Sequence, residues 1–266
     1  MTTLTPPMRR RQAAFTLPEL LVVIAIIGIL VSLTMAAVMR VRASGTRTEN
    51  FHRIEKISLG ISAAKTELNL VNIPSGGFRL RNTYTNEQPE MDILKTAFPR
   101  ATLMNTGLPD VTLDSNQTLM FFLTGGTALQ YKGFSQNPSN PFETASTARK
   151  GPWLEITPKL YTTTAPAGLS ANGQAWLIDP YGTPYAYFAA VNGKPGAYTN
   201  AAYGGGSAGS AFAYKNGGRY VSESGYQIIS AGQDMKFGST GVLPASDPFG
   251  MDDVANFSKA ALAAGL

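Results

Sequence analysis

Few side chains in this chain have the types and spacing that nucleophilic chemistry requires. His52 is the only histidine, so a Ser-His-Asp triad would have to form around it. Two short patterns match serine nucleophile motifs: residues 62–65 read Ser-Ala-Ala-Lys, and residues 205–209 read Gly-Gly-Ser-Ala-Gly. The first lies in a helical pattern without an accompanying Lys-Thr-Gly, and the second lies in low-complexity sequence. We therefore predict that the protein is not an enzyme.

One carboxylate lies in an unusual place. Residues 14–20 read Ala-Phe-Thr-Leu-Pro-Glu-Leu, and no charged residue follows Glu19 until Arg40. In a helix, the apolar residues 20–39 span about 30 Å, the thickness of a bilayer's hydrocarbon core. A carboxylate beside such a segment costs free energy unless it finds a partner, so we predict a functional role for Glu19. The basic residues 9–11 predict that the segment before Glu19 stays on the cytoplasmic side.

Two ordinary explanations of this segment are weaker. A secretory signal peptide is cleaved after its apolar region, and residues 35–37, Met-Ala-Ala, fit such a site only loosely. An uncleaved membrane anchor explains the apolar run. It does not explain the Phe-Thr-Leu-x-Glu arrangement in front of the run.

Residues 14–20, followed by the apolar run, resemble the amino-terminal signature of type IV prepilins, a family that includes the pseudopilins of type II secretion. The resemblance implies that a prepilin peptidase cuts between Ala14 and Phe15 and methylates the new amine of Phe15. Glu19 then becomes the fifth residue of the mature chain and an assembly contact, pairing with the amine of a neighbouring subunit. The family usually has Gly before the cut, where this chain has Ala14.

Composition limits the other partners and cofactors. The chain has 266 residues and a formal net charge of +5. Removing the three leader arginines from the 22 basic residues leaves 19, against 17 acidic residues, so the mature protein is nearly neutral. We therefore expect no nucleic-acid partner. The absence of cysteine excludes disulfides and thiolate metal sites.

The periodicity of the apolar residues predicts the elements that position these groups. Between residues 47 and 69 they recur at intervals of three and four: Phe51, Ile54, Ile57, Leu59, Ile61, Ala64 and Leu68. Together with the apolar run, this predicts one helix from about residue 16 to about residue 70, ended before Pro74. Shorter helices are predicted over 91–98 and 114–123.

The carboxyl-terminal third has the pattern of strands separated by turns. Short apolar runs at 175–178, 185–189 and 226–230 predict strands, with a turn cluster at 179–184 and a Gly-rich loop over 193–218. The predicted fold class is α+β: a long amino-terminal helix, its first half transmembrane, packed on a carboxyl-terminal antiparallel β-sheet head. The predicted boundaries are leader 1–14, transmembrane half 15–39, amphipathic half 40–72, variable region 73–174, and β-sheet with a calcium loop 175–266.

Two segments of this third extend the resemblance. Residues 179–185, Asp-Pro-Tyr-Gly-Thr-Pro-Tyr, resemble the Asp-Pro-Trp-Gly-Asn-Pro-Tyr turn of major pseudopilins, and residues 230–234 with 252–257 resemble their calcium loop. The resemblance implies calcium bound by the side chains of Asp234, Asp252 and Asp253 and by the carbonyls of Ala231 and Lys236. Met235 stands where the family has Gly, the loop is longer than usual, and its spacing is not that of an EF-hand.

The expected function is that of a structural subunit of a type II secretion pseudopilus. Its expected partners are prepilin peptidase, an inner-membrane assembly platform and other pseudopilin subunits. The expected location is the bacterial inner membrane, crossed once, with the head in the periplasm. Two alternatives remain open: a pilin of a type IV surface pilus serving adhesion, motility or DNA uptake, and a membrane-anchored periplasmic enzyme.

Overall fold

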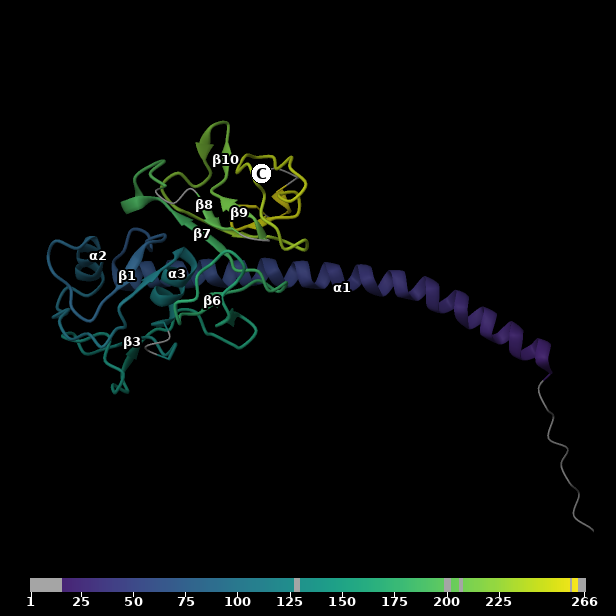
Figure 1. Ribbon diagram of the computed structural model, residues 1–266, viewed down its shortest axis with the longest axis horizontal. Coiled ribbons are helices and arrows are strands. Elements are labelled where there is room, and N and C mark those ends of the chain that lie inside the picture. The colour runs from purple at the N-terminus through teal and green to yellow at the C-terminus, as the bar shows by residue number, and fades with distance from the viewer. Residues whose placement is uncertain (1–15, 127–129, 199–201, 206–207, 259, 263–266) are drawn as a thin grey trace, which may run out of the picture. The chain divides into compact units, whose positions relative to one another are not determined.

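The protein has the α+β fold predicted from its sequence. The computed structural model describes residues 16–266 apart from 127–129, 199–201, 206–207, 259 and 263–266. In chain order (Figure 1) the elements are α1 (Leu17–Leu68), β1 (Phe78–Leu80), α2 (Pro89–Ala97), β2 (Val111–Leu113), α3 (Ser115–Thr124), β3 (Phe134–Ser135), β4 (Arg149–Lys150), β5 (Tyr161–Thr162), β6 (Trp176–Leu177), β7 (Ala186–Ala189), the 3-10 turn η1 (Val191–Gly193), β8 (Ala202–Gly204), β9 (Ser210–Phe212), β10 (Lys215–Asn216), β11 (Arg219–Tyr220), β12 (Tyr226–Ser230) and β13 (Val254–Ala255).

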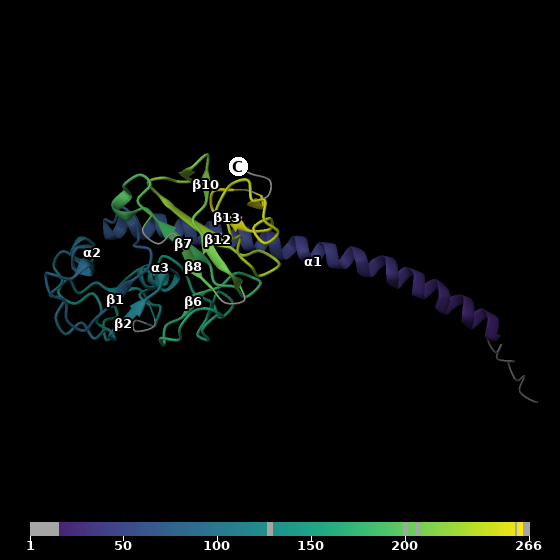
Figure 2. The same ribbon diagram turned by 45° about the horizontal axis from the view of Figure 1, so that its top comes forward.

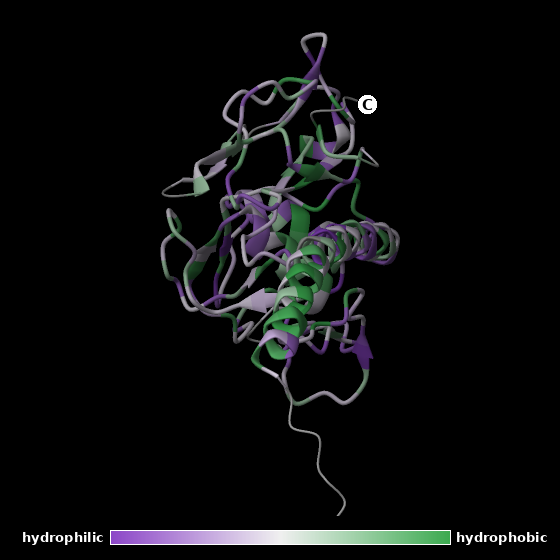
Figure 3. Cartoon of the chain, turned by 90° about the vertical axis from the view of Figure 1, so that its right-hand side faces the viewer, coloured by the Kyte–Doolittle hydropathy of each residue, from purple (hydrophilic) through white to green (hydrophobic). Residues whose placement is uncertain are grey.

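The chain divides into two compact units, Met1–Gly45 and Thr46–Leu266. The boundaries predicted from the sequence divide the chain more finely and stay predictions. In the first unit, α1 is long and apolar enough to cross a membrane, and none of its most apolar stretch is buried inside the protein. Figure 3 shows this part of α1 coloured as hydrophobic. Pro18 does not interrupt α1 because it lies in the first turn, where the helix does not need its N–H.

In the second unit, α1 buries one stripe of apolar side chains. Ile54, Ile57, Ile61 and Leu68 are buried, whereas Leu59 is exposed. The prediction that Leu59 belongs to the stripe was wrong. A residue two positions after Ile57 lies about 200° around the helix from it, on the opposite face.

The long helix ends in a left-handed residue, as helices commonly do. Asn69 has a φ of 54°, and the N–H of Leu70 donates to the carbonyl of Lys65 at 3.0 Å. This is the hydrogen bond of a Schellman motif, which satisfies a carbonyl that the helix itself leaves free.

A three-stranded antiparallel sheet in the order β13-β12-β7 lies at the centre of the second unit (Figure 2). Tyr187 and Ile228 belong to the core that contains the α1 stripe, whereas Phe188 and Ile229 belong to a second core. Neighbouring residues of a strand point to opposite faces, so apolar side chains cover both faces of this sheet. The Tyr187 hydroxyl donates to the carbonyl of Ile73 at 2.8 Å and joins the sheet to the segment after α1.

The region between α1 and the sheet contributes to the first core. The predicted helices over 91–98 and 114–123 are confirmed as α2 and α3, and every residue of α3 is buried. Phe121 of α3 contacts the rings of Phe78, Phe122, Phe134 and Phe142 at centroid distances of 5.4 to 6.2 Å. This part of the chain is therefore an integral layer of the head.

The prediction that residues 193–218 form a loop was wrong. They contain the hairpin β8–β9 and the strand β10, which pairs with β11. Tyr203 and Ala211 of the first hairpin lie opposite each other and are buried in the second core. A high glycine content predicts irregular structure, but here two buried side chains hold the hairpin against the sheet.

Candidate functional site

The amino-terminal end of α1 carries a capping box centred on Glu19. The backbone N–H and the hydroxyl of Thr16 each donate to Glu19 Oε2 at 2.8 Å, and the N–H of Glu19 reaches Thr16 Oγ1 at 3.4 Å. Sequence reasoning missed this role, although Thr-x-x-Glu before an apolar run is its known signal. Ala14 and Phe15 lie outside the described residues. The assembly role of Glu19 stays a prediction.

The turn at residues 179–184 is held by a buried chain of hydrogen bonds. Asp179 Oδ1 accepts from the N–H groups of Tyr181 and Thr183, each at 2.9 Å, and its Oδ2 accepts from the Ser230 hydroxyl at 2.6 Å. Asn50 of α1 donates to Ser230 Oγ at 2.8 Å, and its Oδ1 accepts from the Tyr185 hydroxyl at 3.0 Å. Burial raises the pKa of Asp179 to about 6, because these donors only partly replace lost hydration.

Two of the predicted calcium ligands shape a turn together. Asp252 Oδ2 accepts from the N–H groups of Gln233 at 2.6 Å and Asp234 at 3.0 Å, while Asp234 Oδ1 accepts from the N–H of Lys236 at 2.8 Å. Gly232 makes the close approach possible, since a Cβ there would lie 2.4 Å from the Asp252 carbonyl oxygen. Burial also raises the pKa of Asp234.

Asp253 is held in a different environment. It is fully buried, and its Oδ2 accepts from the Tyr214 hydroxyl at 2.8 Å and from the N–H of Gly238 at 3.0 Å. Its Oδ1 is buried and has no hydrogen-bond partner among the described residues. Burial raises the pKa of Asp253 to about 8.

The structure adds a carboxylate that sequence reasoning missed. Asp247 Oδ1 accepts from the N–H of Gly250 at 3.0 Å, and its Oδ2 is a second buried oxygen without a partner in the described structure. A Cβ at Gly250 would lie 2.8 Å from that Oδ2 and 3.0 Å from the Tyr214 hydroxyl, so Asp247 lies beside Tyr214. Asp247 lies between the two segments that carry the resemblance, residues 230–234 and 252–257, so the resemblance assigned it no role.

These side chains do not form a complete metal centre as they stand. Within the described ranges, no three histidine, aspartate or glutamate side chains are grouped so that they could hold one ion. Ala231 is buried, and Lys236 directs its Nζ toward the Phe249 ring, 4.6 Å from the centroid. The structure therefore leaves the calcium ligands Asp234, Asp252, Asp253, Ala231 and Lys236 as predictions.

The serine pattern at residues 62–65 does not pair a nucleophile with a base. The Ser62 hydroxyl donates to the Ser58 carbonyl at 3.0 Å, and Lys65 Nζ donates to Asn72 Oδ1 at 2.9 Å. His52 is exposed, and its Nδ1 lies 3.6 Å from Glu55. The pattern at 205–209 includes residues outside the described part of the chain.

Comparison with known families gives one match. Residues 9–35 match the family model of the prokaryotic N-terminal methylation motif, which spans Ala14, Phe15 and Glu19. No curated protein and no solved structure matches the chain. Together with the apolar part of α1, the motif indicates a membrane-anchored precursor of the type IV pilin kind, a structural rather than an enzymatic family.

Proposed function

We propose that this type IV pilin-like precursor is a structural subunit of a type II secretion pseudopilus. The observation that carries the proposal is the methylation motif at residues 9–35, which extends into the first part of α1, where the apolar side chains are exposed. Apolar side chains that the protein does not bury need a bilayer or a neighbouring subunit. In a subunit that is stored in the membrane and then assembled through this helix, the bilayer covers these side chains first and neighbouring subunits cover them afterwards.

The proposed life cycle follows from the positions of the charged groups. Prepilin peptidase cuts between Ala14 and Phe15, the basic residues 9–11 stay in the cytoplasm, and the head lies in the periplasm. The subunit then joins others at an inner-membrane platform, and the growing periplasmic filament drives protein secretion. Two features favour this branch of the family over a surface pilus. They are the turn at 179–184 and the absence of cysteine, since many surface pilins close their heads with a disulfide.

The experiment expresses the full chain with prepilin peptidase and determines the mature amino terminus by mass spectrometry. We expect a chain that begins with N-methylated Phe15, and we expect Ala14→Arg to remain uncut. Uncut wild-type protein, or cleavage near residue 37, would overturn the proposal. Deletion of the gene separates the two branches, because loss of secretion without loss of surface filaments identifies a pseudopilin and the reverse identifies a pilin.

We further propose that the loop of residues 231–253 binds calcium. Asp247 and Asp253 each keep one buried oxygen that has no partner within the described part of the chain. Burying such an oxygen costs free energy unless a cation or donor satisfies it. Asp234 and Asp252 lie close enough to disfavour ionisation of Asp253. Calcium, which prefers oxygen ligands, would relieve this repulsion and fix the loop in a head without disulfides.

Thermal melting in detergent tests the calcium site. We expect calcium to raise the melting temperature of the full chain, and Asp253→Asn or Asp247→Asn to remove that rise. Asp92→Asn, on the exposed side of α2, is the matched control and should respond as wild type does. An equal rise with and without Asp253 would contradict the proposal.

A further inference from the structure

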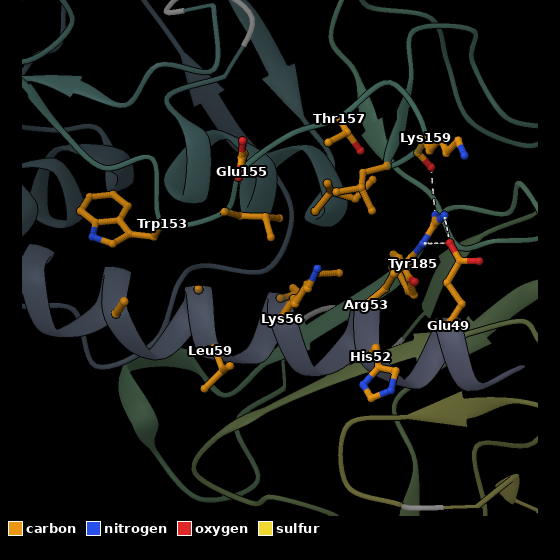
Figure 4. Close-up of a pocket in the computed structure, with 16 residues that line it drawn as sticks. Glu49, His52, Arg53, Lys56, Leu59, Trp153, Glu155, Thr157, Lys159 and Tyr185 are labelled. Carbon is orange, nitrogen blue, oxygen red and sulfur yellow. Dashed lines mark hydrogen bonds and ion pairs between the residues drawn. The ribbon is translucent and has the colours of Figure 1, made fainter. Parts of the chain in front are cut away.

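A groove of about 620 Å³ lies between α1 and residues 153–160 in the second unit (Figure 4). Ile57 of α1, Leu154, Leu177 and Tyr185 supply apolar side chains to its lining. Gly60 lets the two walls approach, because a Cβ there would lie 2.9 Å from the Trp153 carbonyl oxygen. We call this feature the α1 groove.

The rim of the α1 groove is basic. Lys56 and Lys159 are exposed, and among the described residues neither forms an ion pair, whereas Glu155 is the acid that lines this part of the groove. Glu49 does not offset them, because it is bound to Arg53 at 2.5 Å. Leu59 points to the other side of α1 from Ile57, exposes 65% of its surface and lies at the open edge of the same groove.

A second surface of the head has the opposite character. Met235, Phe249 and Met251 expose between 42% and 51% of their surface. They are joined into one area by the bond between the Asp234 N–H and Asp252 Oδ2, and by Lys236, whose Nζ lies above the Phe249 ring. We call this area, apolar with two carboxylates, Asp234 and Asp252, and one cation, Lys236, at its margin, the carboxyl-terminal patch.

The two surfaces cannot meet within one molecule. Figures 1 and 2 both show the carboxyl-terminal segment on one side of the head part of α1 and β6, beside the groove, on the other. When a contact joins two different surfaces of identical subunits, the complex keeps a free α1 groove at one end and a free carboxyl-terminal patch at the other. Unless the rotation closes a ring, such contacts produce an open helical filament.

We propose that the carboxyl-terminal patch of one subunit docks in the α1 groove of a second copy of this chain. The exposed apolar side chains of the patch meet the apolar lining, and in the calcium-free head Asp234 and Asp252 approach Lys56 and Lys159. Burial of the apolar surfaces supplies the affinity, and the charges set the orientation. This inference rests on the proposed filament function and identifies a head contact that the membrane helix alone does not provide.

Disulfide cross-linking tests the contact directly, because the chain has no cysteine of its own. The double variant Leu59→Cys with Met251→Cys is produced in cells that assemble the filament and is then oxidised. A disulfide forms only where the two Cα atoms lie within about 7 Å. We expect a ladder of covalent dimers, trimers and longer species, whereas a mixture of the two single variants should stop at dimers.

Two controls make the result specific. The pair Leu59→Cys with Met104→Cys joins the groove to another exposed apolar residue outside the patch and should give no ladder. Lys159→Glu in the cross-linking background should lower the yield about fivefold, and the added change Met235→Lys should restore it, since an exposed ion pair is worth up to about 1 kcal/mol.

The outcomes separate this inference from the proposed function. Filaments that form but give no ladder with the Leu59 and Met251 pair overturn the contact and leave the filament function intact. A cross-link from Leu59→Cys to a different protein, without self-ladders, also overturns it. If the wild-type chain is not processed and forms no filament, the proposed function fails first.

Discussion

Glu19 caps α1, and we also propose that it pairs with a neighbouring subunit. Replacing it with glutamine, whose side chain has the same length, separates the two roles. Its carboxylate completes the capping box with Thr16, while the proposed assembly role needs its negative charge. Glutamine at this position of a capping box still accepts from the backbone N–H but carries no charge. We expect Glu19→Gln to give a processed, membrane-resident subunit that fails to assemble, as measured by filament yield.

Thr16 provides the control for Glu19. Thr16→Ser keeps the hydroxyl that accepts from the Glu19 N–H, and Thr16→Val removes it at nearly constant volume. If the cap alone mattered, Thr16→Val would lower filament yield and Glu19→Gln would not. The opposite result supports the charge pairing.

Asp179 is expected to make stability depend on pH. Its folded pKa of about 6 lies above the ordinary value, so ionisation of Asp179 costs the folded state free energy. That cost is absent below about pH 4, grows as pH rises to 6, and then stays near 3 kcal/mol. Asp179→Asn keeps an oxygen for the Tyr181 and Thr183 N–H groups and cannot ionise. We expect its unfolding free energy, relative to wild type, to rise by up to that amount between pH 4 and pH 7.

Asp110 provides a control, because its effect on stability should depend on pH with the opposite sign. Its pKa is lowered by hydrogen bonding to Arg79, so the stability it contributes is present above its ordinary pKa and is lost as the pH falls. Asp110→Asn should therefore be less stable than wild type at neutral pH, and the difference should vanish in acid. A flat difference for Asp179→Asn over the same range would contradict the assigned pKa.

Within α1, we expect substitution of alanine at two different glycines to have opposite effects on stability. A Cβ at Gly60 would meet the Trp153 carbonyl oxygen at 2.9 Å, whereas a Cβ at Gly45 would have no other atom within 4 Å. Alanine is favoured over glycine in a helix by about 1 kcal/mol. We expect Gly45→Ala to stabilise the protein by about that amount, and Gly60→Ala to destabilise it by about 1–3 kcal/mol through overpacking. Chemical denaturation in detergent measures both.

The elements that sequence predicted well are those whose pattern is local. The long α1, the capped α3 and the strand β12 each follow from continuous periodicity or a terminal signal. The exposure of Leu59 follows from helix geometry alone once Ile57 and Ile61 are fixed in the core. The hairpin β8–β9 was missed because its stability comes from Tyr203 and Ala211 packing on a distant sheet, which its own glycine-rich sequence does not reveal.

The candidate site also has a part that the sequence predicts and a part that it does not. The amino-terminal motif is contiguous, so its residues could be named from the sequence, and the family match covers the same positions. The loop of residues 231–253 brings together Asp247, Tyr214 and Asp253 from separate segments. Asp247 could not be predicted, because only folding places it beside Tyr214.

At the scale of the whole molecule, the central sheet joins two hydrophobic cores. Ile228 faces the core that contains α1, and its neighbour Ile229 faces the core that contains the carboxyl-terminal loop. Both side chains are fully buried and belong to the same strand, β12. Neither core can lose its packing without exposing one face of a strand that the other core also needs. The head should therefore unfold in one cooperative step.

Ile228→Val and Ile229→Val test this as a matched pair. Each deletes one buried methylene, which typically costs about 0.5–1.5 kcal/mol. If the cores share one transition, both variants lower the same midpoint, and far- and near-ultraviolet circular dichroism give coincident curves. If the second core unfolds independently, Ile229→Val lowers only an earlier transition, in which near-ultraviolet signal is lost while the α1 helix signal remains. That result would make the carboxyl-terminal loop a separately ordered segment. The structure of the carboxyl-terminal patch would then depend on the packing of the second core alone.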